Sequence, residues 1–419
     1  MALVMRVHGA VILWLSTPES RAMHAQRILR RCLTSVLDPM HASRRRVLLE
    51  ALQALIDGRR LTMTDLSRSW PGATFSHAPL KAVDRLLSNV HVQQSILPFS
   101  RAIATWLLSV PRPVLVVDWV DLKRDGCWCA LRAAMPTQGR TVTVFERIYP
   151  IKQINSQSAE RDFLAALAQV LPRHVRPILV TDAGFRSAWF REVAGYGWDY
   201  VGRIRNNLKV QSHEDEPWRA CASLHTGAGG RAEDLGAYRI VQSAPVACRL
   251  VRIRRARKHR EQLTRAGLPQ QGTAARKARS GAREPWMLAT SLPSGQPFEA
   301  AKIVAIYSKR MQIEESFRDL KSHRYGMGFE DSQTRDGRRL SVLLLLNMLA
   351  GFVAWVLDLA LKSIVLSTDP LAARPTLQGR YSGFRRAIEW LRIRLWPPPL
   401  AEAVKTTLIE LLKSTAKSA

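Results

Sequence analysis

The sequence predicts a mixed α/β fold in which a sheet follows an N-terminal group of helices. Two apolar runs, residues 114–118 and 177–182, each end in an aspartate. A run that is apolar throughout is typical of a strand buried on both faces. Helical periodicity dominates residues 23–108, whereas strands and amphipathic segments alternate between 158 and 204. This change of pattern indicates a helical part followed by a mixed α/β sheet.

The composition indicates a folded protein with a polyanionic partner. The 419 residues include 63 Lys or Arg and 34 Asp or Glu, which gives a formal net charge of +29. A hydrophobic fraction of 47% with 12 Trp is enough for a buried core, so disorder is excluded as the main state. Charge of this size in a folded chain points to nucleic acid. A membrane surface is the weaker alternative, because the sequence has no lipidation motif or basic amphipathic anchor.

The five cysteines do not predict a disulfide framework or a zinc site. They are scattered and lack paired CxxC spacing. Cys127 and Cys129 lie two residues apart in an apolar run, so a strand would place both on one face, where simple packing is the expectation. The usage is typical of a reduced, cytosolic chain.

Residues 1–22 are expected to be dispensable. Their apolar stretch at 11–15 weakly imitates a signal peptide. Nothing further along the chain resembles a secreted protein. The other interpretation is that the reading frame extends too far upstream and that translation starts at Met23.

Short helices with basic faces are predicted between residues 23 and 108. Residues 46–55 have apolar residues at helical spacing and stop at Asp57-Gly58. Residues 64–69 follow a Thr cap, and 81–89 form another helix with Lys81 and Arg85 on its exposed side. Such a module suits DNA docking; the alternative is a packed bundle without that role.

The α/β part begins with three predicted strands, at 112–119, 127–133 and 141–148. They precede a helix at 158–170, a strand at 177–182, a helix at 187–194 and a strand at 200–204. Residues 206–300 interrupt this alternation with β-like pieces at 238–241, 246–253 and 286–291.

A basic tract lies inside this interruption. Residues 249–283 contain twelve Lys or Arg, and 259–282 have few large apolar side chains. We expect a flexible loop that touches phosphates, with a solvated linker as the alternative.

Residues 340–366 form an apolar helix that is nearly long enough to span a bilayer. Asn347, Asp358 and Lys362 interrupt it, so a buried core helix is the preferred interpretation and no membrane is expected.

Two carboxylates are expected to meet at one edge of the sheet. Asp118 and Asp182 each follow a buried strand. Adjacent carboxylates repel unless a cation lies between them, and oxygen-rich clusters suit Mg²⁺ or Mn²⁺. An aspartate after a strand is common, so neither residue is decisive alone.

A third carboxylate is predicted on a helix at 301–321. At about 100° per residue, Arg310, Glu314 and Lys321 fall on one stripe with Tyr307, joined by Arg318. Glu315 points roughly 100° away from Glu314. A carboxylate for metal among cations for phosphates would explain this face, and so would an ordinary solvated face.

This face resembles a known family. Tyr307, Arg310, Glu314 and Lys321 reproduce the spacing Y-(2)-R-(3)-E-(6)-K, which marks bacterial DDE transposases of the insertion-sequence-four family. Val-Asp-Trp around Asp118 and Asp-Ala-Gly-Phe from Asp182 are also similar to that family. The resemblance covers residues 23 to at least 366 and is least clear in the last 50.

The resemblance implies the following organisation. Residues 23–110 would be a helical DNA-binding domain, 111–205 and 301–366 an RNase-H-like catalytic core, 206–300 a β-rich insertion, and 367–419 C-terminal helices. Asp118, Asp182 and Glu314 would hold two divalent metal ions, Mg²⁺ or Mn²⁺. One ion would activate water or a 3′-hydroxyl and the other would stabilise the leaving oxygen.

The family cuts its element free through a DNA hairpin, which requires a flipped base. Trp286 occupies the position of the base-stacking tryptophan, and Met311 matches the residue that probes the vacated stack. A core residue on a strand is the alternative for Trp286. Arg310 and Lys321 would grip phosphates near the cleaved end, with Tyr307 beside them.

The expected function is therefore cut-and-paste DNA transposition. The partners would be double-stranded DNA, as terminal inverted repeats and target, and a second copy of the chain in the DNA complex. The expected location is the cytoplasm, in association with the nucleoid. One alternative is an inactive DNA-binding repressor derived from a transposase, and another is a structure-specific nuclease or resolvase.

Overall fold

The chain was analysed as a computed structural model. It describes residues 5–7, 10–12, 24–123, 125–205, 208–255, 272, 284–323, 326–364, 382–393 and 396–418. Most of the 1–22 segment and nearly all of the basic loop at 259–282 lie outside these residues. The chain divides into two compact units, residues 1–106 with 326–417, here the helical unit, and residues 107–325, here the sheet unit.

The helical unit is built from helices at both ends of the chain. Its elements are the short strands β1 Met5–Val7 and β2 Ala10–Ile12, and the helices α1 His24–Cys32, α2 Thr34–Leu37, α3 Ala42–Gly58, α4 Met63–Arg68, α5 His77–Ser88, α6 Val90–Gln94, most of α7 Ile96–Leu107, η4 Phe329–Asp331, α13 Gly337–Lys362, α14 Gly383–Arg392 and α15 Pro398–Ser418. The predicted cap of α4 is Thr62, whose hydroxyl accepts a hydrogen bond from Asp65 N at 3.1 Å.

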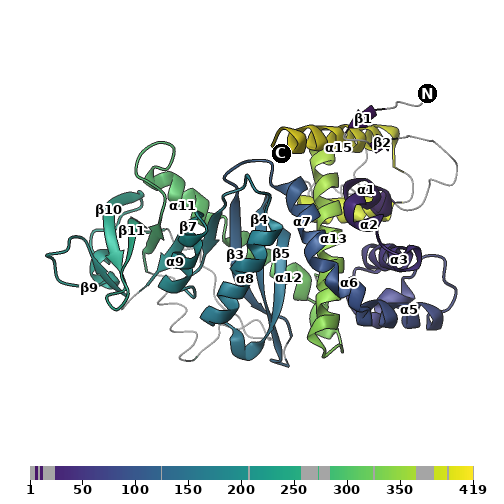
Figure 1. The fold of residues 1–419 in the computed structure, drawn as a ribbon, viewed down its shortest axis with the longest axis horizontal. Coiled ribbons are helices and arrows are strands. Elements are labelled where there is room, and N and C mark those ends of the chain that lie inside the picture. Colours follow the sequence, from purple (N-terminus) through teal and green to yellow (C-terminus); the bar gives the residue numbers. More distant parts are fainter. Residues whose placement is uncertain are drawn as a thin grey trace. The chain divides into compact units, whose positions relative to one another are not determined.

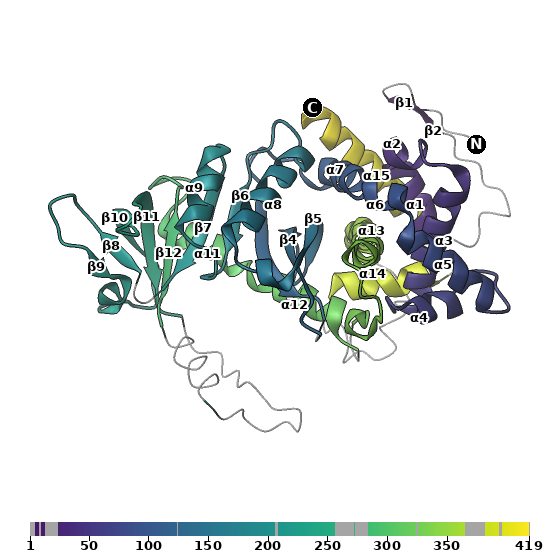
Figure 2. The ribbon, with the colours of Figure 1, turned by 60° about the horizontal axis from the view of Figure 1, so that its bottom comes forward.

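Helix α13 is the central element of the helical unit. It packs against α1, α3, α5, α6 and α14, and Figure 2 views it almost along its axis. Its length and composition would allow it to cross a membrane, but 83% of its most apolar window is buried inside the protein. It is a core helix, as expected. The sequence grouped 301–366 with the sheet; instead, α13 belongs to the helical unit because its apolar surface is covered by helices.

The sheet unit contains one mixed sheet of ten strands among the described residues. Its order is β5-β4-β3-β6-β7-β12-β11-β10-β8-β9. The strands are β3 Val114–Asp121, β4 Trp128–Pro136, β5 Thr141–Pro150, β6 Ile178–Thr181, β7 Asp199–Ile204, β8 Lys209–Gln211, β9 Arg219–Ala220, β10 Glu233–Ile240, β11 Val246–Ile253 and β12 Trp286–Thr290. The prediction of a large mixed sheet is confirmed.

The segment 206–300 continues this sheet. Strand β12 pairs antiparallel with β7, with Met287 opposite Ile204, and β11 pairs with β12. The sequence treated these strands as an insertion, and the structure joins them to the central sheet through the edge of β7.

Helices cover the sheet, as Figure 1 shows. They are α8 Gln157–Val170, α9 Ser187–Gly195, α11 Ala300–Ser308 and α12 Met311–Lys321, with short turns at η2 Ile151–Gln153 and η3 Cys221–His225. Leu115, Val116 and Val117 of β3 are all completely buried, although successive residues face opposite sides of a strand. Both faces of β3 are therefore covered, which is why its sequence is apolar without alternation.

Candidate functional site

Asp118 and Asp182 lie level with each other on neighbouring parallel strands. Strands β3 and β6 pair in register, with Val114 opposite Ile178 and Val116 opposite Val180. The same offset, continued past the end of the pairing, brings Asp118 opposite Asp182. Burial and the charge of Asp182 raise the pKa of Asp118 to about 7, and the charge of Glu314 adds to that effect. The two carboxylates therefore interact, as the sequence predicted.

Alternation along β3 decides which helix Asp118 faces. The neighbouring Trp119 packs edge-on against Tyr149, with ring centroids 5.5 Å apart, and the Tyr149 hydroxyl donates to Asp162 of α8 at 2.7 Å. Because adjacent side chains of a strand point to opposite faces, Asp118 points to the other face. There its Oδ2 accepts a hydrogen bond from Arg310 Nη1 at 3.2 Å, beside α12.

The loop after β6 is shaped around Asp182. The backbone N–H of Gly184 donates to Asp182 Oδ1 at 2.8 Å. A Cβ atom at position 184 would lie only 3.0 Å from that oxygen and 3.6 Å from Asn155 Oδ1, so glycine permits the approach. Asn155 has a left-handed backbone, with φ of 58°. Sequence reasoning missed Asn155, since nothing in its local pattern indicates that it lies near Asp182.

Glu314 enters the site from α12 through Arg310. Arg310 Nη2 donates to Glu314 Oε1, one helical turn away, while Nη1 contacts Asp118. The Arg310 side chain is 11% exposed, Asp118 is 15% exposed and Glu314 is 46% exposed. One guanidinium thus bridges carboxylates from the sheet and the helix.

The predicted single helix at 301–321 is in fact two helices. Helix α11 ends at Ser308 and α12 begins at Met311. Across the break, Arg310 N bonds to Tyr307 O at 2.9 Å and Ile313 N to Arg310 O at 3.1 Å. These i to i+3 hydrogen bonds tighten the turn, so the count of about 100° per residue does not hold through it.

The polar stripe predicted on that helix also needs correction. Tyr307 is 4% exposed and lies in the core, and Arg318 forms an ion pair with Glu315. Lys321 is half-buried at the last turn of α12. Tyr307 is buried but lies near enough to Arg310 for each group to affect the pKa of the other, while Arg310 bonds to Glu314 and Asp118.

The pKa of Arg310 reflects its position among anions. Burial by itself would lower the pKa of the guanidinium, but the phenolate that Tyr307 forms at high pH and the carboxylates of Glu314 and Asp118 outweigh burial and raise it. A protonated Arg310 therefore neutralises part of the repulsion among the carboxylates.

The donor set fits a divalent metal by its chemistry. Asp118, Asp182 and Glu314 supply only carboxylate oxygens, which Mg²⁺ and Mn²⁺ prefer. The Arg310 guanidinium lies between Asp118 and Glu314, so this position stabilises a positive charge. In the part of the chain that the structure describes, no three Asp, Glu, His or Cys side chains are close enough to ligate one metal ion. Metal ligation by all three would require Arg310 to release its partners.

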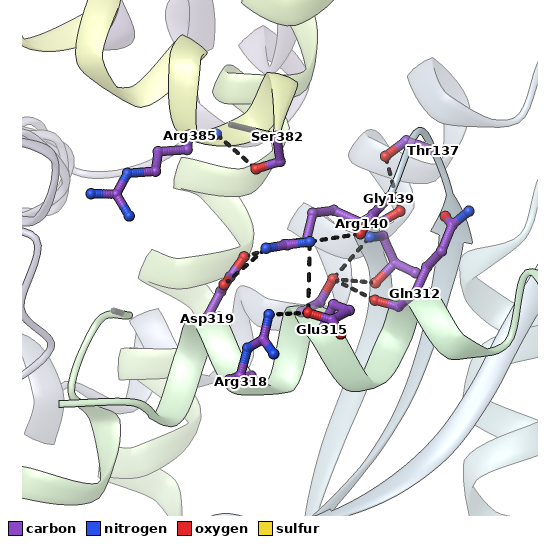
Figure 3. Close-up of polar contacts among 11 residues, drawn as sticks. Thr137, Gly139, Arg140, Gln312, Glu315, Arg318, Asp319, Ser382 and Arg385 are labelled. Carbon is purple, nitrogen blue, oxygen red and sulfur yellow. Dashed lines mark hydrogen bonds and ion pairs between the residues drawn. The ribbon is translucent and has the colours of Figure 1, made fainter. Parts of the chain in front are cut away.

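The β4–β5 hairpin holds α12 on the sheet. Arg140 at the end of this hairpin donates to Asp319 Oδ2 through Nε and to Asp319 Oδ1 through Nη2 at 3.4 Å, and its Nη1 lies 3.9 Å from Glu315 (Figure 3). Thr141 N donates to Ser316 Oγ at 2.8 Å. These contacts fix the rotation of α12 about its axis, which sets the direction of Glu314. The sequence contained no signal for Arg140, because its partners lie about 180 residues further along the chain.

A buried ion pair lies beneath α12. Arg132 of β4 donates to Glu146 Oε2 of β5 at 2.8 and 2.6 Å, and both side chains are at most 5% exposed. The Arg132 guanidinium also lies over the Phe317 ring of α12, 4.9 Å from its centroid. The pair therefore supports the underside of the helix that carries Glu314.

Trp286 lies on β12 beside the start of the helix break. Its ring packs edge-on against Tyr307 at 4.9 Å, and the Arg255 guanidinium lies 5.2 Å over it. Trp286 is half-buried, while Met311 is 39% exposed and its sulfur lies 3.4 Å from Arg310 Nη2. Trp286 is thus partly accessible, on the side of the sheet unit that holds Tyr307.

Comparison with known proteins gives one similar solved structure and a family. No curated protein sequence matches the chain. A solved piggyBac transposase synaptic complex with hairpin DNA is similar over 94% of this chain and 87% of that chain, at 10% identity and a TM-score of 0.43. That similarity is too low to carry information about this chain's ligands.

The family match is stronger, and it covers residues 135–351, more than half of the chain. The matched region contains Asp182, Glu314 and the helix break, and it begins after Asp118. On this match the chain belongs to the transposase DDE domain family.

Proposed function

We propose that this transposase is a cut-and-paste enzyme of the insertion-sequence-four family, similar in particular to the transposase of transposon ten. It binds the terminal inverted repeats of its element as a homodimer, cleaves them through a hairpin intermediate and joins the 3′ ends to target DNA. It acts in the cytoplasm on nucleoid DNA. Asp118, Asp182 and Glu314 are the proposed catalytic and metal-holding residues.

One observation carries the proposal: Arg310 bonds to Asp118 of a strand and to Glu314 of a helix, and the charge of Asp182 on the adjacent strand helps to raise the pKa of Asp118. Converging carboxylates raise one another's pKa and destabilise the fold unless a cation is present, so such a cluster is typical of a functional site. Two Mg²⁺ or Mn²⁺ ions held by these residues would activate the attacking water or 3′-hydroxyl and stabilise the leaving oxygen. Gly184 and the hairpin at Arg140 hold Asp182 and Glu314 in their directions.

The sheet order supports an RNase-H-like core. Strands β3, β4 and β5 are antiparallel neighbours, and β6 and β7 follow β3 in parallel on its other side. In this arrangement the first strand, β3, is central, and it carries Asp118 just beyond the residues that pair with β6. The core then comprises residues 111–205 together with α11 and α12.

Trp286 and Met311 are the proposed residues for the hairpin step. The half-buried Trp286 ring, braced on its edge by Tyr307, offers a rigid surface on which an extruded base could stack. The exposed Met311 side chain is available to enter the stack that the base leaves.

The helical unit supplies a proposed DNA-binding surface on α5. His77, Lys81 and Arg85 recur every four residues and are all exposed, so they form one stripe. In the described part of the chain, neither Lys81 nor Arg85 forms an ion pair. The acidic residue of the same helix, Asp84, pairs with Arg339 at 2.7 Å. This leaves a net positive face that complements phosphates.

The test is cleavage of a labelled transposon end by purified full-length variants. Asp118→Asn, Asp182→Asn and Glu314→Gln should each abolish cleavage and leave end binding almost unchanged. Asp121→Asn is the matched control, since Asp121 is an exposed carboxylate on the same strand, on the opposite face. Glu315→Gln should be much milder. A wild-type chain that binds ends but never cleaves them would favour the repressor, and equal loss of binding in all three variants would contradict the assignment.

A further inference from the structure

Arg310 makes two hydrogen bonds with one guanidinium, and each goes to a different carboxylate of the site. Nη1 lies 3.2 Å from Asp118 Oδ2, and Nη2 bonds to Glu314 Oε1. The Arg310 side chain is 11% exposed and Asp118 is 15% exposed, so their interaction occurs with little water, whereas Glu314 is 46% exposed. The remaining nitrogen, Nε, is buried and has no hydrogen-bond partner within the described residues.

A guanidinium and a divalent metal compete for the same oxygens. Asp118 Oδ2 and Glu314 Oε1 accept hydrogen bonds from Arg310, and the same two carboxylates would hold the metal. Two cations held side by side would also repel each other. Arg310 and a metal bridging these two carboxylates therefore exclude each other.

Resting on the function proposed above, we propose that Arg310 is a built-in counterion that occupies the metal position in the DNA-free protein. Arg310 releases Asp118 and Glu314 when a DNA phosphate offers it another partner. The exchange keeps the protein from ligating metal tightly until an end is bound.

The local structure lets Arg310 change partners at low cost. Arg310 lies in the turn between α11 and α12, so its side chain can reorient without moving either helix. Nε of Arg310 has no hydrogen bond to lose when the side chain moves away from the carboxylates. A buried donor without a partner also makes the present position of the side chain less favourable. A phosphate accepts a guanidinium in a bidentate manner, which satisfies two donors at once.

The exchange makes a reciprocal prediction. If DNA draws Arg310 away from the carboxylates, DNA must strengthen metal binding by the same factor as metal strengthens DNA binding. Couplings of this kind typically amount to about 5- to 150-fold in affinity.

The experiment measures Mn²⁺ binding to the full-length, DNA-free protein by electron paramagnetic resonance. Arg310→Gln removes the competing charge and should bind Mn²⁺ about tenfold tighter than the wild type, or more. Arg310→Lys keeps the charge but cannot bridge two carboxylates, so its affinity should be intermediate. Arg318→Gln is the matched control, because Arg318 contacts Glu315 and neither proposed ligand, and it should bind Mn²⁺ like the wild type.

A short duplex carrying the transposon end provides the second measurement. The duplex should raise the Mn²⁺ affinity of the wild type severalfold and leave that of Arg310→Gln almost unchanged. Circular dichroism melting shows which variants are folded. If Arg310→Gln is unfolded, Arg310→Lys takes its place in both measurements.

The outcomes separate the exchange from the proposed function. Asp118→Asn could lose Mn²⁺ binding while neither Arg310→Gln nor Arg310→Lys binds Mn²⁺ more tightly than the wild type. That result would overturn the exchange and would still support the proposed metal site. Unchanged Mn²⁺ binding in Asp118→Asn would overturn both.

Discussion

Arg140 and Asp319 form a two-point contact between the β4–β5 hairpin and α12. Arg140 bonds to both carboxylate oxygens of Asp319 through Nε and Nη2. The contact joins residues that are 179 positions apart in the sequence. Glu314 projects from the same helix one and a half turns earlier, so this contact controls the direction of a proposed catalytic carboxylate without touching it.

Arg140→Ala should therefore lower cleavage and spare DNA binding. Loss of the contact frees α12 to rotate, and a displacement of about 1 Å at a reacting group costs up to about a hundredfold in rate. We expect a fall of about 10- to 100-fold in the single-turnover cleavage rate, with partial rescue by Arg140→Lys. Arg147→Ala is the control on β5, the strand that begins next to Arg140, since Arg147 pairs with Asp162 of α8 and is 46% exposed. Equal losses in the two variants would show that the contact has no positioning role.

The buried pair of Arg132 and Glu146 should contribute to stability asymmetrically. Removing one partner leaves the other charge buried without compensation, which costs about 3–5 kcal/mol. Glu146→Ala should lower the free energy of unfolding by that amount in urea titrations. The double variant Arg132→Met with Glu146→Leu removes both charges and should be much closer to the wild type. A double variant that is as unstable as Glu146→Ala would contradict this account.

Glu160 of α8 predicts a pH dependence of stability. It is 5% exposed, and burial raises its pKa to about 7, against the opposing effects of Trp119 and Arg186. Between its unfolded pKa and pH 7, the folded state holds a proton that the unfolded state has lost, so stability falls as pH rises through this range. Above pH 7 Glu160 is ionised in both the folded and the unfolded state, and the loss of folding free energy has reached its full size, on the order of 3 kcal/mol.

Glu160→Gln removes that cost. The variant should be more stable than the wild type at pH 8 and similar to it near pH 4.5, as measured by thermal melting at both values. An equal gain at both pH values would mean that Glu160 does not titrate in this range.

Trp286→Ala should separate the two steps of end cleavage. First-strand nicking needs the carboxylates, which the substitution leaves in place. Hairpin formation needs an extruded base, and an aromatic stacking surface contributes about 1–3 kcal/mol to holding it. On end-labelled DNA, Trp286→Ala should accumulate nicked substrate with little hairpin, and Trp286→Phe should retain most of the second step.

An abasic site at the flipped position gives the control for Trp286. It removes the need to hold a base and should partly restore hairpin formation by Trp286→Ala. If the variant instead fails at nicking, or unfolds, Trp286 acts only as packing for Tyr307.

The stripe on α5 predicts how DNA binding depends on salt. Each phosphate neutralised by a cation adds about 0.9 to the magnitude of the slope of log K against log salt. Lys81→Ala with Arg85→Ala should therefore reduce that slope by about 2, as measured by fluorescence anisotropy. Lys405→Ala is the control, since Lys405 pairs with Glu402 at 2.8 Å in the same unit. An unchanged slope in the double variant would exclude α5 from the interface.

The strands and the helical segment of the candidate site could be predicted from the sequence. Apolar runs ending in Asp118 and Asp182 predicted two buried strands, and the structure pairs these strands in the register that makes the aspartates level. The spacing from Tyr307 to Lys321 predicted a helix, which the structure divides into α11 and α12, and the segment lies within the family match. Such features are visible because strand burial and helix periodicity are recorded in residues close together in the chain.

The tertiary structure alone decided how those elements meet. The break at Lys309–Arg310, the burial of Tyr307 and the pairing of Arg310 with Asp118 depend on contacts with the sheet. So do the attachment of α12 to Arg140 and the placing of α13 in the helical unit. Local periodicity cannot show these features, because their energies come from partners that are brought together only when the chain folds.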